Sequence, residues 1–238
     1  MKIIADTHTH TQPSGDAFST IMENIAVAKE KGLKFICMTE HVNSVPRSVP
    51  EAFLKKLYLI PKHFQGIRLV RGVETNIINY DGLLDVSSDT LNSLEWVIAS
   101  LHTEVIEPAS KYEHTKCWEA IAENPLVDVI GHCGDPQYSF DIEPVVKRFA
   151  KFGKIVEINN HSFESRKGAS EICEQVAKMC MKYSVPVVVG SDAHFAGSVG
   201  EFSLALNMLK KISFPEELIL NASVERFDDY LKNKSVLS

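Results

Sequence analysis

Short apolar runs alternate with longer amphipathic segments along most of this chain. Strands are expected from the apolar runs at residues 2–6, 33–38, 67–73, 96–100, 127–131, 154–158 and 185–190. Continuous apolar runs of this length are typical of parallel strands that are covered on both faces. Helices are expected over residues 20–31, 51–64, 114–123, 142–152, 169–183, 203–211 and 224–232, whereas the segment 81–94 is expected to be irregular.

The first expected helix has recognisable ends. Thr20 and Glu23 have the spacing of a capping box, and Gly32 follows the last helical position. The regular alternation of strands and helices indicates an α/β barrel of parallel strands. We expect seven strands, with residues 218–220 as a candidate rudimentary eighth. No linker-like segment or shift in composition divides the chain, so residues 1–238 are expected to form a single domain.

Composition narrows the class of protein. Hydrophobic residues make up 45% and charged residues 24% of the 238 positions, which allows a large core. Residues 1–10 lack the features of a signal peptide, and no run approaches the roughly 18 apolar residues of a membrane span. The five cysteines, at positions 37, 117, 133, 173 and 180, form no CxxC pair. They are expected to be reduced core thiols of a cytoplasmic protein.

The charge balance bears on the class of partner. The formal net charge is -6, from 31 acidic and 25 basic residues, and the chain has no long Lys/Arg run. This balance argues against a general nucleic-acid-binding surface. The sequence leaves the oligomeric state open, and a homo-oligomer is compatible with it.

Side chains that can bind a metal ion follow nearly every expected strand. They are His8, His10, Asp16, His41, Glu74, His102, His132, Asp192 and His194. Successive strand-end markers from His8 to Asp192 lie 33, 33, 28, 30 and 60 residues apart, and the doubled last interval spans two strand-plus-helix units. Because a barrel brings the carboxyl ends of its strands to one face, we expect these side chains to meet in one metal site.

Two pairs among these side chains share a local geometry. His8 and His10 are two positions apart on an expected strand, so their imidazoles face the same way and can share a cation. Asp192 and His194 repeat this spacing after an apolar run. Asp6 is expected to be the hydrogen-bond partner of a ligand histidine rather than a ligand itself.

Each of these residues has a simpler explanation when it is taken alone. Glu74 could form a buried salt bridge with Arg71, because an unpaired carboxylate in an apolar run is costly. His102 and His132 could be hydrogen-bonded core histidines. Five strand ends that carry such groups are difficult to attribute to chance, and together they favour the metal site.

Several short motifs occur in a characteristic order. They are DTHTHT at 6–11, TEH at 39–41, RGVE at 71–74, SLH at 100–102, IGH at 130–132, EINN at 157–160, SRKG at 165–168, GSDAH at 190–194 and GEF at 200–202. On these motifs the chain resembles the PHP (polymerase and histidinol phosphatase) superfamily over essentially its whole length, and it is most similar to the YcdX-type phosphatases. The resemblance implies a distorted (βα)7 barrel and a trinuclear metal centre, usually described with zinc, that hydrolyses phosphoesters.

The resemblance also implies how the ligands are divided among three ions. One ion would be bound by His8, His10, Glu74 and Asp192, a second by Glu74, His102 and His132, and the third by Asp16, His41 and His194. Glu74, as the bridge, and Asp192 are the residues expected to be catalytic. Two positions depart from the family pattern: Asp16 stands where the YcdX-type proteins have His, and Glu40 replaces a more usual Asp. The site of the third ion is therefore expected to have an altered affinity.

This ligand set predicts a definite chemistry. Imidazoles and carboxylates without thiolate suit zinc, manganese or iron, and up to three ions per chain are expected. Two neighbouring ions can lower the pKa of a shared water to about 7, so a metal-bound hydroxide is the expected nucleophile. A further ion would bind a phosphate oxygen and offset the charge that develops during attack.

Three other polar side chains are candidates for contacts with the substrate. Arg166 and Lys167 lie in the loop after the sixth expected strand, where they could clamp a phosphate or form a solvated charge pair. His161 is expected on the same face. The two remaining histidines, His63 and His114, are expected on the surface.

These observations predict a metal-dependent phosphoesterase that acts on a small phosphorylated metabolite. The nearest alternative is a histidinol-phosphate phosphatase, which uses the same superfamily chemistry. A phosphodiesterase or exonuclease fits the acidic charge balance less well. A non-catalytic metal-binding module is a further alternative, but the presence of Glu74 and Asp192 argues against it.

Overall fold

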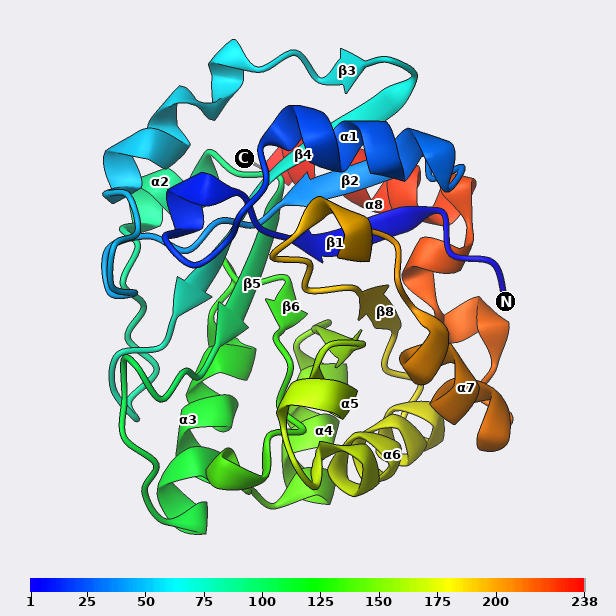
Figure 1. The fold of residues 1–238 in the computed structure, drawn as a ribbon. Coiled ribbons are helices and arrows are strands. Elements are labelled where there is room, and N and C mark those ends of the chain that lie inside the picture. The colour runs from blue at the N-terminus through cyan, green and yellow to red at the C-terminus, as the bar shows by residue number, and fades with distance from the viewer. Residues whose placement is uncertain (238) are drawn as a thin grey trace.

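The computed structural model describes residues 1–237 and contains a sheet of parallel strands surrounded by helices (Figure 1). The parallel strands follow the order β1-β2-β4-β5-β6-β7-β8. Their bounds are β1 (Ala5–Thr9), β2 (Phe35–Met38), β4 (Ile67–Asn76), β5 (Trp96–Ser100), β6 (Val129–Ile130), β7 (Ile155–Asn159) and β8 (Val187–Gly190). A parallel bridge between Thr9 and Ala193 brings the two edges of the sheet together, so the barrel is nearly closed. The expected α/β barrel of seven parallel strands is confirmed.

Helices cover the outside of this barrel and alternate with its strands. The α-helices are α1 (Ile21–Glu30), α2 (Ser88–Asn92), α3 (Lys111–Glu123), α4 (Ile142–Lys151), α5 (Ser162–Ser165), α6 (Ala169–Lys182), α7 (Ser203–Lys211) and α8 (Val224–Leu237). The 3-10 helices are η1 (Gln12–Ser14), η2 (Glu51–Leu59), η3 (Pro136–Tyr138), η4 (Ala196–Ser198), η5 (Glu216–Leu218) and η6 (Leu220–Ala222). The predicted capping box is present, since the Thr20 and Glu23 side chains each bond the backbone amide of the other residue.

Two segments differ from the prediction. The helix expected over 51–64 is the 3-10 helix η2 followed by the short strand β3 (His63–Phe64), which pairs antiparallel with β4. Gly66, with φ of 87°, allows the tight turn between β3 and β4. The rudimentary strand considered at 218–220 is also wrong: this segment lies at the junction of η5 and η6, and only Ile219 forms an isolated bridge, to Val187.

The segment 81–94 and the cysteines agree with the predictions. The stretch 81–94 is largely irregular and contains only the short helix α2, which begins after the capping residue Ser87. All five cysteines are buried and free, as expected for core thiols. Among the described residues, no helix is long and apolar enough to cross a membrane.

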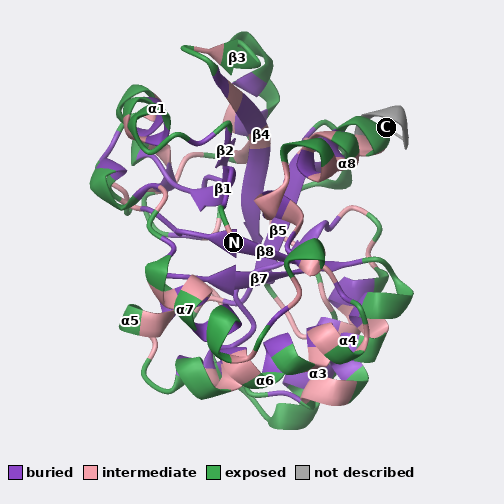
Figure 2. Ribbon diagram, turned by 90° about the vertical axis from the view of Figure 1, so that its right-hand side faces the viewer, coloured by how far each residue is buried: buried purple, intermediate pink, exposed green. Residues whose placement is uncertain are grey.

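The described residues close one end of the barrel and leave the other end open. Buried strands form the centre of the molecule, and exposed residues lie mainly on the surrounding helices and loops (Figure 2). Inside the barrel, Phe227 of α8 packs edge-on against Phe35 and Trp96, with ring centroids 5.1 and 5.4 Å apart. Phe35 and Trp96 are the first residues of β2 and β5, so α8 closes the amino-terminal end of the barrel. The carboxyl ends of the strands form the opposite, open face.

Candidate metal centre

The residues predicted to bind metal all lie at the carboxyl-terminal face of the barrel. His8 belongs to β1 and Glu74 to β4, and the others lie in the segments that directly follow strands. Most of them are buried: His8, His10, His41, Glu74, His132 and Asp192. His102 and His194 are partly exposed, and Asp16 is the most exposed of the nine. Residues from both ends of the sequence therefore share one small volume.

The centre of the cluster is formed by His8, His10, Glu74 and Asp192. The Nε2 atoms of His8 and His10 lie 3.0 Å apart. Glu74 Oε2 lies 3.0 Å from the Nε2 of His8 and 3.3 Å from that of His10. Asp192 Oδ1 lies 3.4 and 3.2 Å from the same two nitrogens. Two nitrogen and two carboxylate ligand atoms thus converge on one point, which suits a divalent cation.

The other oxygen of Glu74 faces a different pair of imidazoles. Glu74 Oε1 lies 2.9 Å from His132 Nε2 and 3.3 Å from His102 Nε2. These two nitrogens are 3.2 Å apart. One carboxylate therefore presents each of its oxygens to a separate group of ligands, which is the arrangement that a bridge between two cations requires.

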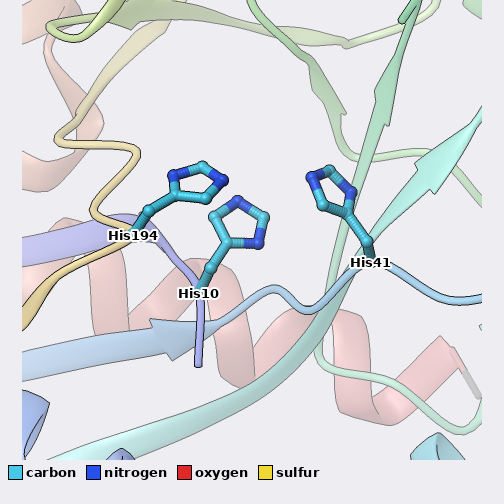
Figure 3. A group of neighbouring side chains, drawn as sticks. All are labelled: His10, His41 and His194. Atoms are coloured by element: carbon cyan, nitrogen blue, oxygen red, sulfur yellow. The ribbon is translucent and has the colours of Figure 1, made fainter. Parts of the chain in front are cut away.

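A third group lies nearer the surface and includes His10, His41 and His194 (Figure 3). The ring of His10 stacks between the other two, with centroids 4.5 Å from His41 and 4.3 Å from His194. Asp16 Oδ2 lies 3.4 Å from His194 Nε2 and 3.7 Å from His41 Nε2. Asp16 thus reaches the edge of this group.

Hydrogen bonds orient three of the histidines toward the cluster. His8 Nδ1 lies 2.7 Å from Glu157 Oε1, and His102 Nδ1 lies 2.8 Å from Asn76 Oδ1. Because these oxygens are acceptors, each Nδ1 donates, and each Nε2 is left with a free lone pair. His194 follows the same rule, since its Nδ1 donates to the backbone carbonyl of Asp192 at 2.9 Å. Such bonds fix the tautomer that a metal ligand needs.

His10 is oriented through a chain of hydroxyl and carboxylate groups. The Ser14 hydroxyl donates to Glu40 Oε2 at 2.6 Å, so its oxygen accepts from His10 Nδ1 at 3.0 Å. The same oxygen accepts from the backbone amide of His41 at 3.0 Å. Glu40 also accepts from the Thr11 amide at 2.9 Å. Glu40 therefore acts on the cluster through Ser14 rather than as a ligand.

The buried carboxylates require positive charge nearby. Burial alone would raise the pKa values of Glu74 and Asp192, but His8 and neighbouring imidazoles hold both pKa values well below the ordinary range. Burial likewise disfavours a charged His8, yet the carboxylates of Glu157, Glu74 and Asp192 outweigh it and raise the pKa of His8 well above its ordinary value. The carboxylates thus favour a cation at this point of the molecule.

Two further observations fit a metal ion. His41 Nδ1 is buried without a hydrogen-bond partner in the described structure, so a ligand bond to a cation would satisfy it. The alternative salt bridge between Glu74 and Arg71 is absent, because the Arg71 guanidinium donates to the carbonyls of Tyr58 and Ile60 at 3.2 and 2.6 Å. A donor set of imidazoles and carboxylates suits zinc, manganese or iron.

The backbone is strained at two of these positions. His132 has φ of 25° and Asp192 has φ of 57°, a region that residues other than glycine rarely adopt. Strain of this kind is maintained where a site requires it. Gly190 has a related role, because a Cβ there would lie 2.5 Å from Glu157 Oε1 and 2.8 Å from His8 Cβ.

Asp6 differs from its predicted role as the partner of a ligand histidine. Asp6 does not contact a ligand imidazole: it accepts from the amides of Ser191 and Gly200 at 3.0 and 2.7 Å. The partner of His8 is instead Glu157, which the sequence analysis missed although a lone carboxylate within the apolar run KIVEI could have indicated it.

Of the two histidines expected on the surface, one is exposed and the other is buried. His63 is exposed on β3, as expected. His114 is buried, and the prediction for it was wrong. Its Nδ1 donates to the Ser139 carbonyl at 2.9 Å, and its Nε2 accepts from the Ala109 amide at 2.9 Å. It therefore ties the start of α3 to neighbouring loops.

A cleft of about 430 Å³ opens beside the cluster. Arg166 and His161 line it, whereas Lys167 is exposed and lies outside its lining. Arg166 is anchored, with Nε 3.3 Å from Asp135 Oδ2 and a terminal nitrogen that donates to the Ser162 hydroxyl at 2.8 Å. The cleft is large enough for a small molecule and places a fixed guanidinium near the cluster.

Comparison with known proteins identifies the family. A family model described as the PHP domain matches residues 6–185, and a PHP-associated model matches residues 171–218. The chain belongs to the PHP domain family. This PHP protein is 42% identical to a probable phosphatase of Acetivibrio thermocellus over 234 residues, which cover 98% of the chain and 97% of the relative. It is 43% identical to a probable phosphatase of Caldanaerobacter subterraneus subsp. tengcongensis over 236 residues, which cover 98% and 93%.

A solved structure shares the architecture. The histidinol phosphate phosphatase of Lactococcus lactis, complexed with zinc, L-histidinol and phosphate, superimposes with a TM-score of 0.65. The match covers 89% of this PHP protein and 94% of the other chain at 19% sequence identity. It confirms the predicted barrel.

Proposed function

We propose that this PHP protein hydrolyses a small phosphorylated metabolite at a multinuclear metal centre. The predicted enzyme class, a hydrolase of phosphoric esters, is confirmed by its relatives named probable phosphatases. The observation that carries the finer proposal is Glu74, whose two oxygens face two different groups of imidazoles. A carboxylate in that position can bridge two cations at the mouth of a cleft.

In this proposal the ligands form three groups, and the first two share Glu74. His8, His10, Glu74 and Asp192 would hold one ion, Glu74, His102 and His132 a second, and His41 and His194 with Asp16 the third. Zinc is the leading candidate for up to three ions, with manganese or iron as alternatives. Bound metal would supply an activated water and a positive charge opposite the phosphate oxygens.

In this proposal, other side chains of the protein orient the ligand imidazoles and bind the phosphate. Glu157, Asn76 and Ser14 hold ligand imidazoles in one tautomer, which keeps the Nε2 lone pairs aimed at the cluster. Arg166, held by Asp135, offers a fixed guanidinium to the phosphate. His161 lines the cleft beside His194, with ring centroids 6.3 Å apart, and is a second candidate contact.

Histidinol phosphate remains one member of the substrate class to be tested. The structural likeness to a histidinol phosphate phosphatase, at 19% identity, supports a shared fold and does not assign the substrate. A nuclease is disfavoured by the net charge of -6. A non-catalytic module is disfavoured because ligand side chains from the whole chain converge on a solvent-accessible cleft.

Metal analysis and a phosphatase screen on one preparation test the proposal. The protein is stripped with chelator, reconstituted with zinc or manganese, and assayed against a generic phosphomonoester and a panel that includes histidinol phosphate. We expect more than one and up to three ions per chain, and hydrolysis that depends on the ions. Absence of metal after reconstitution, or a metal-loaded protein that cleaves no phosphomonoester, would contradict it.

A further inference from the structure

Arg47 is a second cation in the cleft, and the metal-binding scheme does not use it. It belongs to the loop between β2 and η2, which also contains His41. Like Arg166, it lines the cleft beside the cluster. The two arginines come from different sides of the open face: α5, which precedes Arg166, lies below the centre of Figure 1, and the loop after β2 lies at its left edge.

The two guanidinium groups differ in their partners. Arg166 is partly buried and bonded to Asp135 and Ser162. Arg47 is exposed, and its side chain forms no hydrogen bond or ion pair within the described structure. Of the two arginines among the described lining residues, Arg47 is therefore the one that forms no ion pair with a carboxylate. A free guanidinium with five donors at the mouth of a cleft is suited to an anionic group.

The backbone holds Arg47 in place at the cost of strain. Its φ is 71°, which is unfavourable for a residue with a Cβ. The loop is closed by the bond from the Asn43 amide to the Val49 carbonyl at 3.1 Å, and the Val49 amide donates to Pro13 at 3.0 Å. Gly15 packs against it so closely that a Cβ there would lie 2.6 Å from the Arg47 carbonyl carbon. The loop is thus pinned to the segment that carries Asp16.

Apolar side chains line the cleft beside Arg47. Val45 and Pro46, from the same loop, and Leu101, which precedes His102, line the cleft with Arg47. A ligand with its phosphate at the metal cluster and Arg166 would meet apolar atoms on this wall and then the free guanidinium.

We propose that Arg47 binds a second anionic group of the substrate, separate from the phosphate that is cleaved. The favoured substrates are small phosphomonoesters with an additional carboxylate or phosphate. This inference rests on the proposed phosphatase function and names the substrate class more closely. Arg47 is a specificity residue in this scheme and contacts none of the reacting atoms.

Pairs of substrates that differ in one anionic group test the specificity. Glycerol 3-phosphate and 3-phosphoglycerate differ by a carboxylate, and fructose 6-phosphate and fructose 1,6-bisphosphate differ by a phosphate. We expect the wild-type enzyme to favour the second member of at least one pair by about tenfold in kcat/KM, through KM. Arg47→Met should remove this preference without changing kcat/KM for the first member, and Arg47→Lys should restore part of it. The two pairs show whether the anion is a carboxylate or a phosphate.

A binding measurement separates this inference from the phosphatase activity itself. Methylphosphonate and phosphonoacetate share a phosphonate that is not an ester and differ in a carboxylate, so calorimetry on the metal-loaded protein reads the contact without turnover. If the second anion is a carboxylate, Arg47→Met should weaken the binding of phosphonoacetate by about tenfold and leave the binding of methylphosphonate unchanged. If it is a phosphate, the same loss should be seen with a bisphosphonate in place of phosphonoacetate. Lys29→Met, which removes an exposed charge from α1, is the matched control.

The outcomes distinguish the two proposals. If Arg47→Met weakens both members of a pair equally, or neither, the inference about a second anion is overturned, whereas the phosphatase stands as long as a generic phosphomonoester is cleaved. If no phosphomonoester is cleaved, the proposed function fails, and the calorimetric difference still decides whether Arg47 binds the additional anion.

Discussion

Glu157 connects two parts of the candidate metal centre. Its Oε1 accepts from His8 Nδ1 at 2.7 Å, and its Oε2 accepts from the His132 amide at 3.1 Å. The carboxylate therefore orients one candidate ligand by its ring and another by its strained backbone. It lies within 3.2 Å of the Asn159 side-chain amide, which also donates to Asp192 at 3.1 Å. In this way β7 is linked to β1 and to the segments that follow β6 and β8.

Glu157→Gln should weaken metal binding while the fold is retained. The amide replaces the charge that holds the His8 tautomer, and loss of such a partner typically costs 10–100-fold in metal affinity. Competition with a chromophoric chelator measures the affinity. Glu164→Gln, at an exposed carboxylate of α5, is the control. Equal zinc affinity in Glu157→Gln and wild-type protein would show that the bond to His8 is incidental.

Glu74→Ala should remove activity and weaken the binding of two ions. Glu74 is buried, and its two oxygens lie 3.0 Å from His8 Nε2 and 2.9 Å from His132 Nε2, so each of them faces a different candidate ion. Apolar burial supplies most of the stability, so circular dichroism should show a folded protein. Activity toward a generic phosphomonoester that stays within twofold of wild type would make Glu74 a structural carboxylate.

Arg166 and Lys167 can be separated from metal binding because neither has metal-ligand chemistry. The double alanine variant should lose about tenfold or more in kcat/KM, which corresponds to roughly 1.4 kcal/mol, with unchanged metal content. Arg166 lines the cleft and Lys167 does not, so Arg166→Ala should account for the larger share. Lys178→Ala in α6 is the control for loss of a surface charge. Wild-type kinetics in the double variant would move the phosphate contact to His161.

At the scale of elements, β4 and β5 are joined by side-chain contacts of Glu95 as well as by the backbone hydrogen bonds of the sheet. Glu95, directly before β5, accepts from Arg68 at 2.6 Å and from the Arg71 amide at 3.1 Å, both of β4, and from Lys62 at 3.0 Å. The carboxylate is 14% exposed. It thus fixes the beginning of β5 against β4 while both strands carry site residues at their other ends.

The pKa of Glu95 predicts a pH-dependent contribution to stability. Burial opposes the charge, but the bonds from Arg68, Arg71 and Lys62 outweigh it and lower the pKa to about 2 from 4.5. A folded-state pKa below the unfolded value stabilises the protein above pH 4.5, and the contribution is lost as the pH falls toward 2. Glu95→Gln should therefore lower the free energy of unfolding by up to roughly 3 kcal/mol at pH 7.

Urea unfolding of wild type and Glu95→Gln at pH 7, 4 and 3 measures this difference. The gap should narrow as the pH falls through the window between the two pKa values. Glu119→Gln, at a carboxylate paired with Lys116 on the exposed face of α3, should show little change at any pH. A gap that is constant with pH would mean that Glu95 acts by packing and not by its charge.

At the scale of the molecule, the site joins the two ends of the sequence. His8 and His10 come from the first strand and its end, and Asp192 and His194 follow the last strand of the barrel. The edges of the sheet meet there, where the Asp192 amide donates to the His8 carbonyl at 2.9 Å and the His10 amide to Ala193 at 2.9 Å. A bound ion would therefore hold the seam of the barrel as well as serve the chemistry.

Removal of metal should lower the thermal stability of the whole domain. An ion that binds only the folded state stabilises it by RT ln(1 + [L]/Kd), which is about 4 kcal/mol when the free ion is 1,000 times above its Kd. Differential scanning calorimetry with and without chelator should show a lower Tm for the stripped protein. Addition of zinc should restore it. A Tm that is independent of metal would indicate that no ion spans the seam.

The amino-acid sequence determined most of the elements and the kinds of side chain that meet at the candidate site. Residues 96–100 form β5 as predicted, because an apolar run bounded by polar residues is a local property that the chain retains in any arrangement. Histidines and carboxylates that follow such runs reach the face where parallel strands end, so their convergence followed from the barrel alone. Capping at Thr20 is local in the same sense.

Only the tertiary structure decided which groups meet. Glu157 instead of Asp6 binds His8, His114 is buried, and Arg47 stands free in the cleft. These outcomes depend on how neighbouring strands are staggered and on how loops cross the face. A hydrogen bond is made or lost within less than 1 Å, and no periodicity in the sequence records the distance between residues that lie 149 positions apart.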